Sequence, residues 1–349
     1  MRKALVLSTA LALSLMANSA SAATEIQWWH AFTGRLGDLL NEQVEKFNAS
    51  QSDYKVVPTH KGNYSETLNA GIAAFRAGEQ PEILQVFEVG TATMMAADGA
   101  IKPVYEVIAE AGVDFDPDGY LAAVKGYYTT PDGEMLSLPY NSSTPVLYVN
   151  RDALSEAGLD PDMDLATWEQ VGEALDALKA SGHSCPLTTA WQSWVHLENL
   201  SAYHNVPFAT KENGFTALDT ELAFNGPVQV KHVDAMGQWA KDGKFIYAGR
   251  RNEGGANFRA GECAFFTESS AGYAGVKAEA DFDFEIRPLP YWSDAEGAPQ
   301  NTIIGGASLW VMAGNDPEDY KAVAAFLNFL SSAEIQANWH QHTGYLPIT

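Results

Sequence analysis

Positive charge is scarce in this sequence. Lys and Arg number 21 against 44 Asp and Glu, which gives a formal net charge of −23. Such an imbalance argues against nucleic acid or an anionic membrane surface as a partner. An anionic small molecule remains compatible with it, because bulk charge is screened over roughly 8 to 10 Å and the donors inside a site decide what binds there.

Motifs of catalysis and of metal binding are also missing. The sequence has no G-x-S-x-G elbow, no P-loop and no H-E-x-x-H motif. The stretch from Asp114 to Gly119 imitates a calcium loop, but Lys125 stands where a bidentate Glu is required. His340 and His342 have no third ligand close by in the sequence, so zinc is not expected. We therefore expect no enzyme activity, no metal and no cofactor.

Long apolar runs are few, and the marked one is short. Ala4–Met16 is too short to span a bilayer, and it lies between Arg2-Lys3 and the small residues Ala20-Ser21-Ala22. This is the pattern of a secretory signal peptide, so we expect residues 1–22 to be cleaved. No lipid-anchoring cysteine follows the run, which favours a freely diffusing, soluble protein of the periplasm.

Cysteine is scarce as well. Cys185 and Cys263 are the only two, and each begins a predicted buried strand. The periplasm is oxidising and permits a disulfide between them. Two unpaired core cysteines are equally compatible with the sequence, because sequence does not give the Cα separation that a bridge demands.

The sequence is rich in apolar residues arranged in alternating strand and helix patterns. With 349 residues, 46% of them hydrophobic, we expect two lobes. The predicted strands are 25–29, 54–58, 83–87, 145–150, 263–267 and 308–312. The predicted helices are 37–47, 64–76, 91–98, 151–157, one from a Thr167–Gln170 capping box, 228–242 and 318–330. Alternation of this kind predicts parallel βαβ units and an α/β fold.

One stretch resembles a known family. YNSSTPVLYVNRDALSEAGLDPDMDLATWEQ (Tyr140–Gln170) resembles the core of the periplasmic solute-binding proteins of ABC importers, in the maltose-binding-protein-like branch. Within that family, four further segments resemble the members that bind sn-glycerol-3-phosphate: GNYSETLNAGIAAFRAG (62–78), ILQVFEVGTATMM (83–95), APQNTIIGGASLWVM (298–312) and WHQHTGYLPIT (339–349). The resemblance spans essentially the whole mature chain.

The resemblance implies a two-lobed, Venus-flytrap α/β fold, with interleaved lobes that each hold a central, mainly parallel sheet flanked by helices. It implies a monomer that captures sn-glycerol-3-phosphate, or a glycerophosphodiester such as glycerophosphocholine, and delivers it to an inner-membrane ABC permease. Two alternatives remain: a binding protein for a neutral oligosaccharide, and a secreted glycerophosphodiester hydrolase.

The lobes implied by the resemblance are discontinuous. The first comprises residues 23–134 and 293–328 and the second residues 135–292 and 329–349, with crossings near Asp132–Leu138 and Arg287–Tyr291. Family members extend several tens of residues beyond the GYLPIT segment, and an arginine expected to hold the phosphate lies in that part. This chain ends at Thr349, so we expect it to be a fragment.

The resemblance places ligand contacts at seven positions: Tyr64, Glu88, Ser143, Trp191, Ser269, Gly306 and Tyr345. A dianionic phosphate needs hydrogen-bond donors, and glycerol hydroxyls need an acceptor, for which Glu88 is suited. Trp191 offers a flat face to carbon-bound hydrogens. Glu88 and Ser269 also stand at the ends of apolar strands, where parallel sheets present ligand groups.

Several of these positions have a purely structural interpretation. Gly305-Gly306 could form a nest of amides for an oxyanion, or an ordinary connection before the strand 308–312. Tyr64 could simply open a helix, and Ser143 could supply a turn hydroxyl. Packing of the GYLP turn would account for Tyr345.

Overall fold

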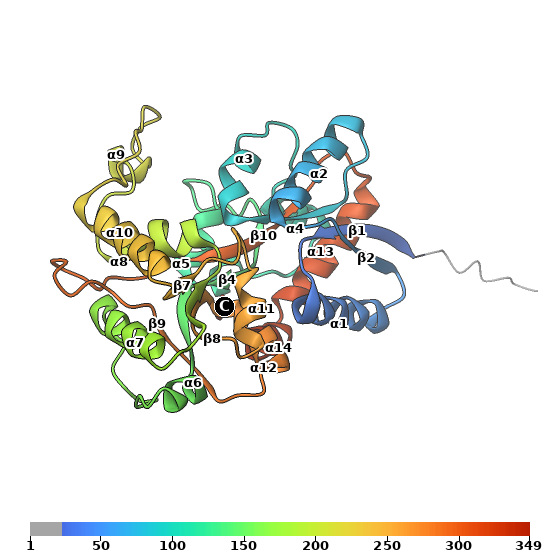
Figure 1. Ribbon diagram of the computed structural model, residues 1–349. Coiled ribbons are helices and arrows are strands. Elements are labelled where there is room, and N and C mark those ends of the chain that lie inside the picture. Colours follow the sequence, from blue (N-terminus) through green and yellow to red (C-terminus); the bar gives the residue numbers. More distant parts are fainter. Residues whose placement is uncertain (1–22) are drawn as a thin grey trace, which may run out of the picture.

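The computed structural model describes residues 23–349, so the expected signal peptide lies outside the described residues. Two five-stranded sheets organise this part of the chain, each with helices around it (Figure 1). Within residues 23–349, no helix combines the length and the apolar character needed to cross a membrane. The two sheets correspond to the two predicted lobes.

The first sheet has the strand order β2-β1-β3-β10-β4. These strands are β1 (Thr24–His30), β2 (Tyr54–His60), β3 (Ile83–Phe87), β4 (Leu138–Ser143) and β10 (Gly305–Val311). β1 pairs in parallel with β2 and β3, whereas β10 runs antiparallel to both β3 and β4. Hence β10 alone is reversed in an otherwise parallel sheet.

The second sheet repeats this plan in the order β7-β6-β8-β5-β9. Its strands are β5 (Pro145–Asn150), β6 (Cys185–Thr189), β7 (Phe245–Ile246), β8 (Cys263–Ser269) and β9 (Phe284–Pro288). β6 pairs in parallel with β7 and β8, and β5 is the reversed strand, antiparallel to β8 and β9. The predicted α/β class with mainly parallel sheets is confirmed.

Helices of the first lobe pack on the first sheet and on one another. They are α1 (Gly34–Ser50), α2 (Tyr64–Ala77), α3 (Thr91–Met95), α4 (Val104–Ala111), α5 (Ala122–Lys125), α13 (Pro317–Ser331) and α14 (Ala333–Thr343). In α1, which covers the helix predicted over 37–47, Leu39, Leu40, Val44 and Phe47 are all buried. α3 ends earlier than predicted, because residues 96–100 form turns.

Helices of the second lobe are α6 (Arg151–Glu156), α7 (Trp168–Ala180), α8 (Asn199–Tyr203), α9 (Thr210–Asn213), α10 (Pro227–Lys241), α11 (Gly254–Arg259) and α12 (Tyr273–Glu279). The predicted capping box is present: the Gln170 amide donates to Thr167 Oγ1 (3.3 Å), and the Thr167 amide donates to Gln170 Oε1 (2.9 Å). Cys185 and Cys263 are register partners on β6 and β8 and form a disulfide, which settles the open alternative.

The crossings between sheets differ from the expected ones. β4 belongs to the first sheet and β5 to the second, so the first crossing is at Thr144 rather than near Asp132–Leu138, because β4 pairs with β10. The return lies beyond the expected Arg287–Tyr291, because Trp292 packs in the second core and the Gln300 amide donates to Tyr203 O (2.8 Å).

Residues 329–349 also pack differently from the expected second lobe. Ile335, Trp339, Tyr345 and Ile348 are buried in the core of the first lobe. α14 contacts α1 and α13 there, and it touches α12 of the second lobe. This segment therefore completes the first core at the place where the two lobes meet.

Candidate ligand-binding site

The expected ligand residues gather where the carboxyl ends of the two sheets meet. Only Thr144 separates β4 from β5, so the edges of the sheets adjoin. Ser143, at the end of β4, pairs with Gly305, and Pro145 pairs with Ser269 at the end of β8. We call this region the shared edge. It comprises the junction of β4 and β5 and the adjoining carboxyl ends of β3 and β8.

Two tyrosine side chains and the side-chain amide of Asn141 form the part of the shared edge that belongs to the first lobe. Tyr64, the first residue of α2, stacks on Phe87 with ring centroids 5.4 Å apart. Its hydroxyl accepts from Asn141 Nδ2 (3.3 Å) and lies near the Tyr345 side chain. Burial raises the pKa of Tyr64 to about 12, so the hydroxyl stays neutral and can donate. Tyr345 also stacks on Trp339.

Asn141 was not among the predicted residues. It lies fully buried on β4, and its Oδ1 accepts from Gln85 Nε2 on β3 (3.1 Å). Both are polar residues inside buried strands, which is the signal that could have identified them, since buried amides need partners.

A hydrogen bond joins Glu88 to the backbone of Gly306. Glu88 follows β3, and its Oε2 accepts from the Gly306 amide (3.2 Å). Burial, with a smaller contribution from the nearby Glu198, raises the pKa of Glu88 to about 7. Because β10 runs antiparallel to β3, the beginning of β10 lies beside the end of β3 at this edge.

The glycine pair corrects one expectation. Gly305 and Gly306 are the first residues of β10, not a connection before it. Gly306 has φ +110°, and a Cβ there would overlap the backbone carbonyl of Asn141. Glycine is required here for the close approach of β10 to β4, and the Gly306 amide is already bonded to Glu88 rather than free in a nest.

The second lobe contributes Trp191, Ser269 and a residue that the prediction missed, Glu268. Ser269 Oγ accepts from the Ala271 amide (3.1 Å), which leaves its own proton free to donate. Glu268 is 5% exposed and accepts from the Ser269 amide (2.6 Å). Burial raises its pKa to about 8, although the Ser269 amide and the nearby Arg259 and Trp191 side chains lower it. An acidic residue after an apolar run is the same signal that pointed to Glu88.

The two lobes touch across the shared edge. A Cβ on Gly305 of the first lobe would overlap the indole of Trp194 from the second. The amide of Ile303 donates to Asn199 Oδ1 (3.0 Å). Neutral hydroxyls, a side-chain amide, aromatic faces and the two carboxyls of Glu88 and Glu268 therefore lie along the shared edge. Such a set is suited to a small polyol that carries an oxyanion.

Metal chemistry receives no support from the described residues. In residues 23–349, His, Cys, Asp and Glu side chains form no group of three that could hold a metal ion. His340 lies in α14 with both ring nitrogens buried and without hydrogen-bond partners.

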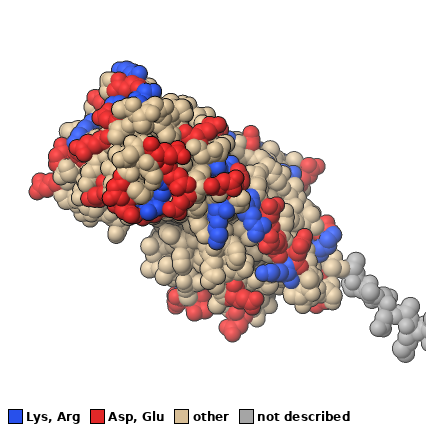
Figure 2. Space-filling model, turned by 60° about the horizontal axis from the view of Figure 1, so that its bottom comes forward, with Lys and Arg blue, Asp and Glu red and all other residues tan. Residues whose placement is uncertain are grey.

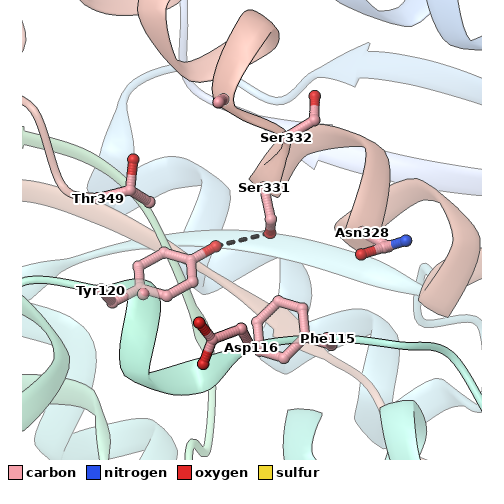
Figure 3. Close-up of a pocket in the computed structure, with 9 residues that line it drawn as sticks. Phe115, Asp116, Tyr120, Asn328, Ser331, Ser332 and Thr349 are labelled. Atoms are coloured by element: carbon pink, nitrogen blue, oxygen red, sulfur yellow. Dashed lines mark hydrogen bonds between the residues drawn. The ribbon is translucent and has the colours of Figure 1, made fainter.

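A cavity of about 320 Å³ lies elsewhere (Figure 3). Tyr120 and Ser331 hydrogen-bond beside it (2.6 Å). None of the seven expected ligand residues lines it; its lining is Phe115, Asp116, Gly119, Tyr120, Asn328, Ser331, Ser332, Ala333 and Thr349. It is therefore separate from the shared edge.

Surface charge follows the acidic composition. In Figure 2, acidic side chains gather over the left part of the face, and basic side chains are interspersed with them. Lys231, for example, pairs with Asp294 (2.7 Å) and Glu169 (3.6 Å). Pairing of this kind leaves these cations neutralised rather than available to a polyanion.

The comparisons with known proteins identify the family. Residues 42–349 match the sequence profile described as bacterial extracellular solute-binding protein. The sn-glycerol-3-phosphate-binding periplasmic protein UgpB of Escherichia coli strain 536 is 52% identical over 97% of this chain and 77% of its own length. The protein of the same name from Pectobacterium atrosepticum is 51% identical over 97% of this chain and 76% of its own length.

A solved structure shares the fold. UgpB from Mycobacterium tuberculosis in complex with glycerophosphocholine superposes with a TM-score of 0.77 at 24% identity, covering 93% of this chain and 82% of that one. This likeness confirms the predicted two-lobed fold. The relatives and the family profile confirm the predicted periplasmic location. The chain belongs to the family of bacterial extracellular solute-binding proteins.

Proposed function

We propose that this protein captures sn-glycerol-3-phosphate in the periplasm and delivers it, as a monomer, to an inner-membrane ABC permease. The observation that carries the proposal is 52% identity over 97% of the chain to a protein of that name. The two relatives reported above are named as binding proteins rather than enzymes, which supports capture without catalysis.

The ligand lies along the shared edge in this proposal. The hydroxyls of Ser143 and Ser269 donate to the phosphate together with Tyr345, and Glu88 accepts from a glycerol hydroxyl. Support comes from the free proton of Ser269 and from the neutral, buried tyrosines. Trp191 covers the carbon backbone, as the position of its side chain near Glu268 allows.

Hinge closure is the working step. The ligand residues come from both lobes, so a ligand that touches both favours the closed form by its differential affinity. Thr144 and the segment between Gln300 and Gly305 are the connections at which the lobes rotate. The permease then recognises the closed form.

The magnitude is adequate for capture. A charge-assisted hydrogen bond contributes roughly 1.5 to 3 kcal/mol. Four or five of them reach about −8 kcal/mol, or micromolar affinity, after the cost of ordering is subtracted.

Calorimetric titration of the purified protein tests the proposal. We expect binding of sn-glycerol-3-phosphate and a weaker or absent response to maltose. Glycerophosphocholine forms a third arm, because a phosphodiester presents the same glycerol and one phosphate charge fewer. A response to maltose alone would overturn the assignment, and release of choline from glycerophosphocholine would identify a hydrolase instead.

Substitutions localise the site. Ser269→Ala removes a donor at the shared edge and should weaken binding about tenfold or more, since an unpaired phosphate oxygen costs over 1 kcal/mol. Ser155→Ala changes an exposed serine of α6; it is the matched control and should leave affinity unchanged. Equal affinities for the two variants would move the site away from Ser269.

A further inference from the structure

A buried line of hydrogen bonds lies beneath the shared edge in the second lobe. Trp292 Nε1 donates to His232 Nδ1 (3.2 Å), and His232 Nε2 lies 3.0 Å from His196 Nδ1. His196 Nε2 lies 2.9 Å from Thr267 Oγ1 and 3.0 Å from Thr189 Oγ1. We call these five residues the histidine network. It connects α10 and the segment after β9 with the ends of β6 and β8.

The Trp292 indole determines which atom donates and which accepts in each of these hydrogen bonds. An indole N–H can only donate, so Nδ1 of neutral His232 accepts and its proton is on Nε2. His196 then accepts at Nδ1 and carries its own proton on Nε2, facing the two threonines. Burial lowers the pKa of His196 to about 3, so the neutral form on which this direction depends is the one present.

The network ends at the peptide before Trp191. Thr267 Oγ1 donates to Thr189 Oγ1 (2.7 Å), which donates to Ala190 O (3.1 Å). The Ala190 amide donates to Thr267 O (2.9 Å), and the Trp191 amide donates to Arg251 O (2.8 Å). Each backbone polar group on the amino side of Trp191, namely the Ala190 amide, the Ala190 carbonyl and the Trp191 amide, is therefore hydrogen-bonded.

Trp191 itself has an unusual backbone. Its φ is +48°, in the left-handed region that bulky L-residues disfavour. Such a conformation persists only where the surrounding structure over-determines it, and it is frequent at ligand sites. His196 lies in the single turn of π-helix Trp194–Glu198 that begins soon after Trp191, and π-turns are likewise frequent at functional sites.

We propose that the buried His196–His232 pair is a positioning device that holds Trp191 in its left-handed conformation and so keeps the indole at the ligand-binding edge. This inference deepens the proposed function and rests on it for the ligand. Trp191 is the residue that touches the ligand, and the histidines act through it.

Variants of His232 test the device. His232→Leu removes both bonds of the ring and releases His196, whereas His232→Gln keeps an oxygen to accept from Trp292 and an amide to donate to His196. Thr189→Val is a second, isosteric break nearer to Trp191. His204→Leu is the matched control, because His204 is also buried and bonded to the Trp292 amide but lies outside the network.

The first readout needs no ligand. In protein labelled with 5-fluorotryptophan, the ¹⁹F resonance of Trp191 is identified by its loss in Trp191→Gly. We expect this resonance to shift or broaden in His232→Leu and Thr189→Val, and to stay in place in His232→Gln and His204→Leu. An unmoved Trp191 resonance in folded Thr189→Val or His232→Leu protein overturns the inference.

The second readout is affinity for sn-glycerol-3-phosphate. We expect His232→Leu to weaken binding about tenfold and His232→Gln less than about twofold. In a Trp191→Gly background, where glycine adopts positive φ freely and no ring needs positioning, His232→Leu should cost nothing further. An equal loss in both backgrounds marks a merely structural role and refutes the proposal. If wild-type protein does not bind this ligand, the proposed function fails while the ¹⁹F result still decides the positioning role.

Discussion

Glu268 offers a direct test of the electrostatics beside the ligand-binding edge. Its carboxyl lies on β8 with 5% of its surface exposed. Burial raises the pKa from 4.5 to about 8, although the Ser269 amide, Arg259 and Trp191 each lower it. Replacing it with Gln keeps the shape and an accepting oxygen and removes the charge. We therefore expect Glu268→Gln to stabilise the protein at alkaline pH.

The sign and size follow from proton linkage. Below pH 4.5 the carboxyl is protonated in both states and contributes no pH-dependent cost. Between pH 4.5 and 8 the folded protein holds a proton that the unfolded chain has released, so ionising conditions destabilise the fold by about 1.4 kcal/mol per pH unit. The destabilisation that accumulates between pH 5 and pH 8 is therefore at most about 4 kcal/mol. Relaxation of the protein around the charge reduces it to roughly 2 to 4 kcal/mol.

Urea unfolding at pH 5, 6.5 and 8 measures this quantity. The free energy of unfolding of Glu268→Gln minus that of wild type should grow steadily with pH. Glu262→Gln removes an exposed carboxylate next to the other end of the same strand and should show no such growth. If the difference in free energy of unfolding between Glu268→Gln and wild type stays constant from pH 5 to pH 8, the reasoning is refuted. A difference that does not depend on pH reflects hydrogen bonding rather than charge.

Three further perturbations have defined outcomes. Replacing Cys185 and Cys263 together by Ala should lower the free energy of unfolding by about 4 kcal/mol, because the bridge closes a loop with a sequence separation of 78; a loss under 1 kcal/mol in urea contradicts this. Gly306→Ala should abolish ligand binding or folding, since its Cβ would overlap a carbonyl of β4; wild-type affinity by calorimetry speaks against it. His196→Gln should reduce the loss of stability on acidification by about 1.4 kcal/mol per pH unit between pH 6.5 and 5, because the unfolded histidine binds a proton that the folded one, with a pKa of about 3, does not; parallel urea curves would disprove it.

Local signals predicted the elements well. The strands 83–87 and 145–150 have the predicted bounds, and the capping box at Thr167 is formed as expected. Apolar runs, turn residues and caps act over a few residues, so sequence alone carries them. The early end of α3 and the early start of β10 were missed, because tertiary pairing and turns decide those limits.

Long-range contacts explain the other misses. The strand LPYNSS (138–143) was not among the predicted strands, and its pairing with β10 is what places it in the first sheet. Asn141 and the histidine network likewise depend on partners tens of residues away. Glu268 is different: the argument used for Glu88 applied to it equally, and only the family resemblance directed attention to Ser269 instead.

The reversed strand in each sheet explains how the expected ligand residues come together. In a wholly parallel sheet, only strand ends reach the carboxyl edge. Reversal of β10 and β5 brings strand beginnings to that same edge, so the Gly306 amide meets Glu88 and Pro145 pairs with Ser269. β10 begins with glycine and offers an amide, whereas β5 begins with proline and offers none. At the shared edge the first lobe therefore presents a backbone amide, which is hydrogen-bonded to Glu88, whereas the second lobe presents side chains.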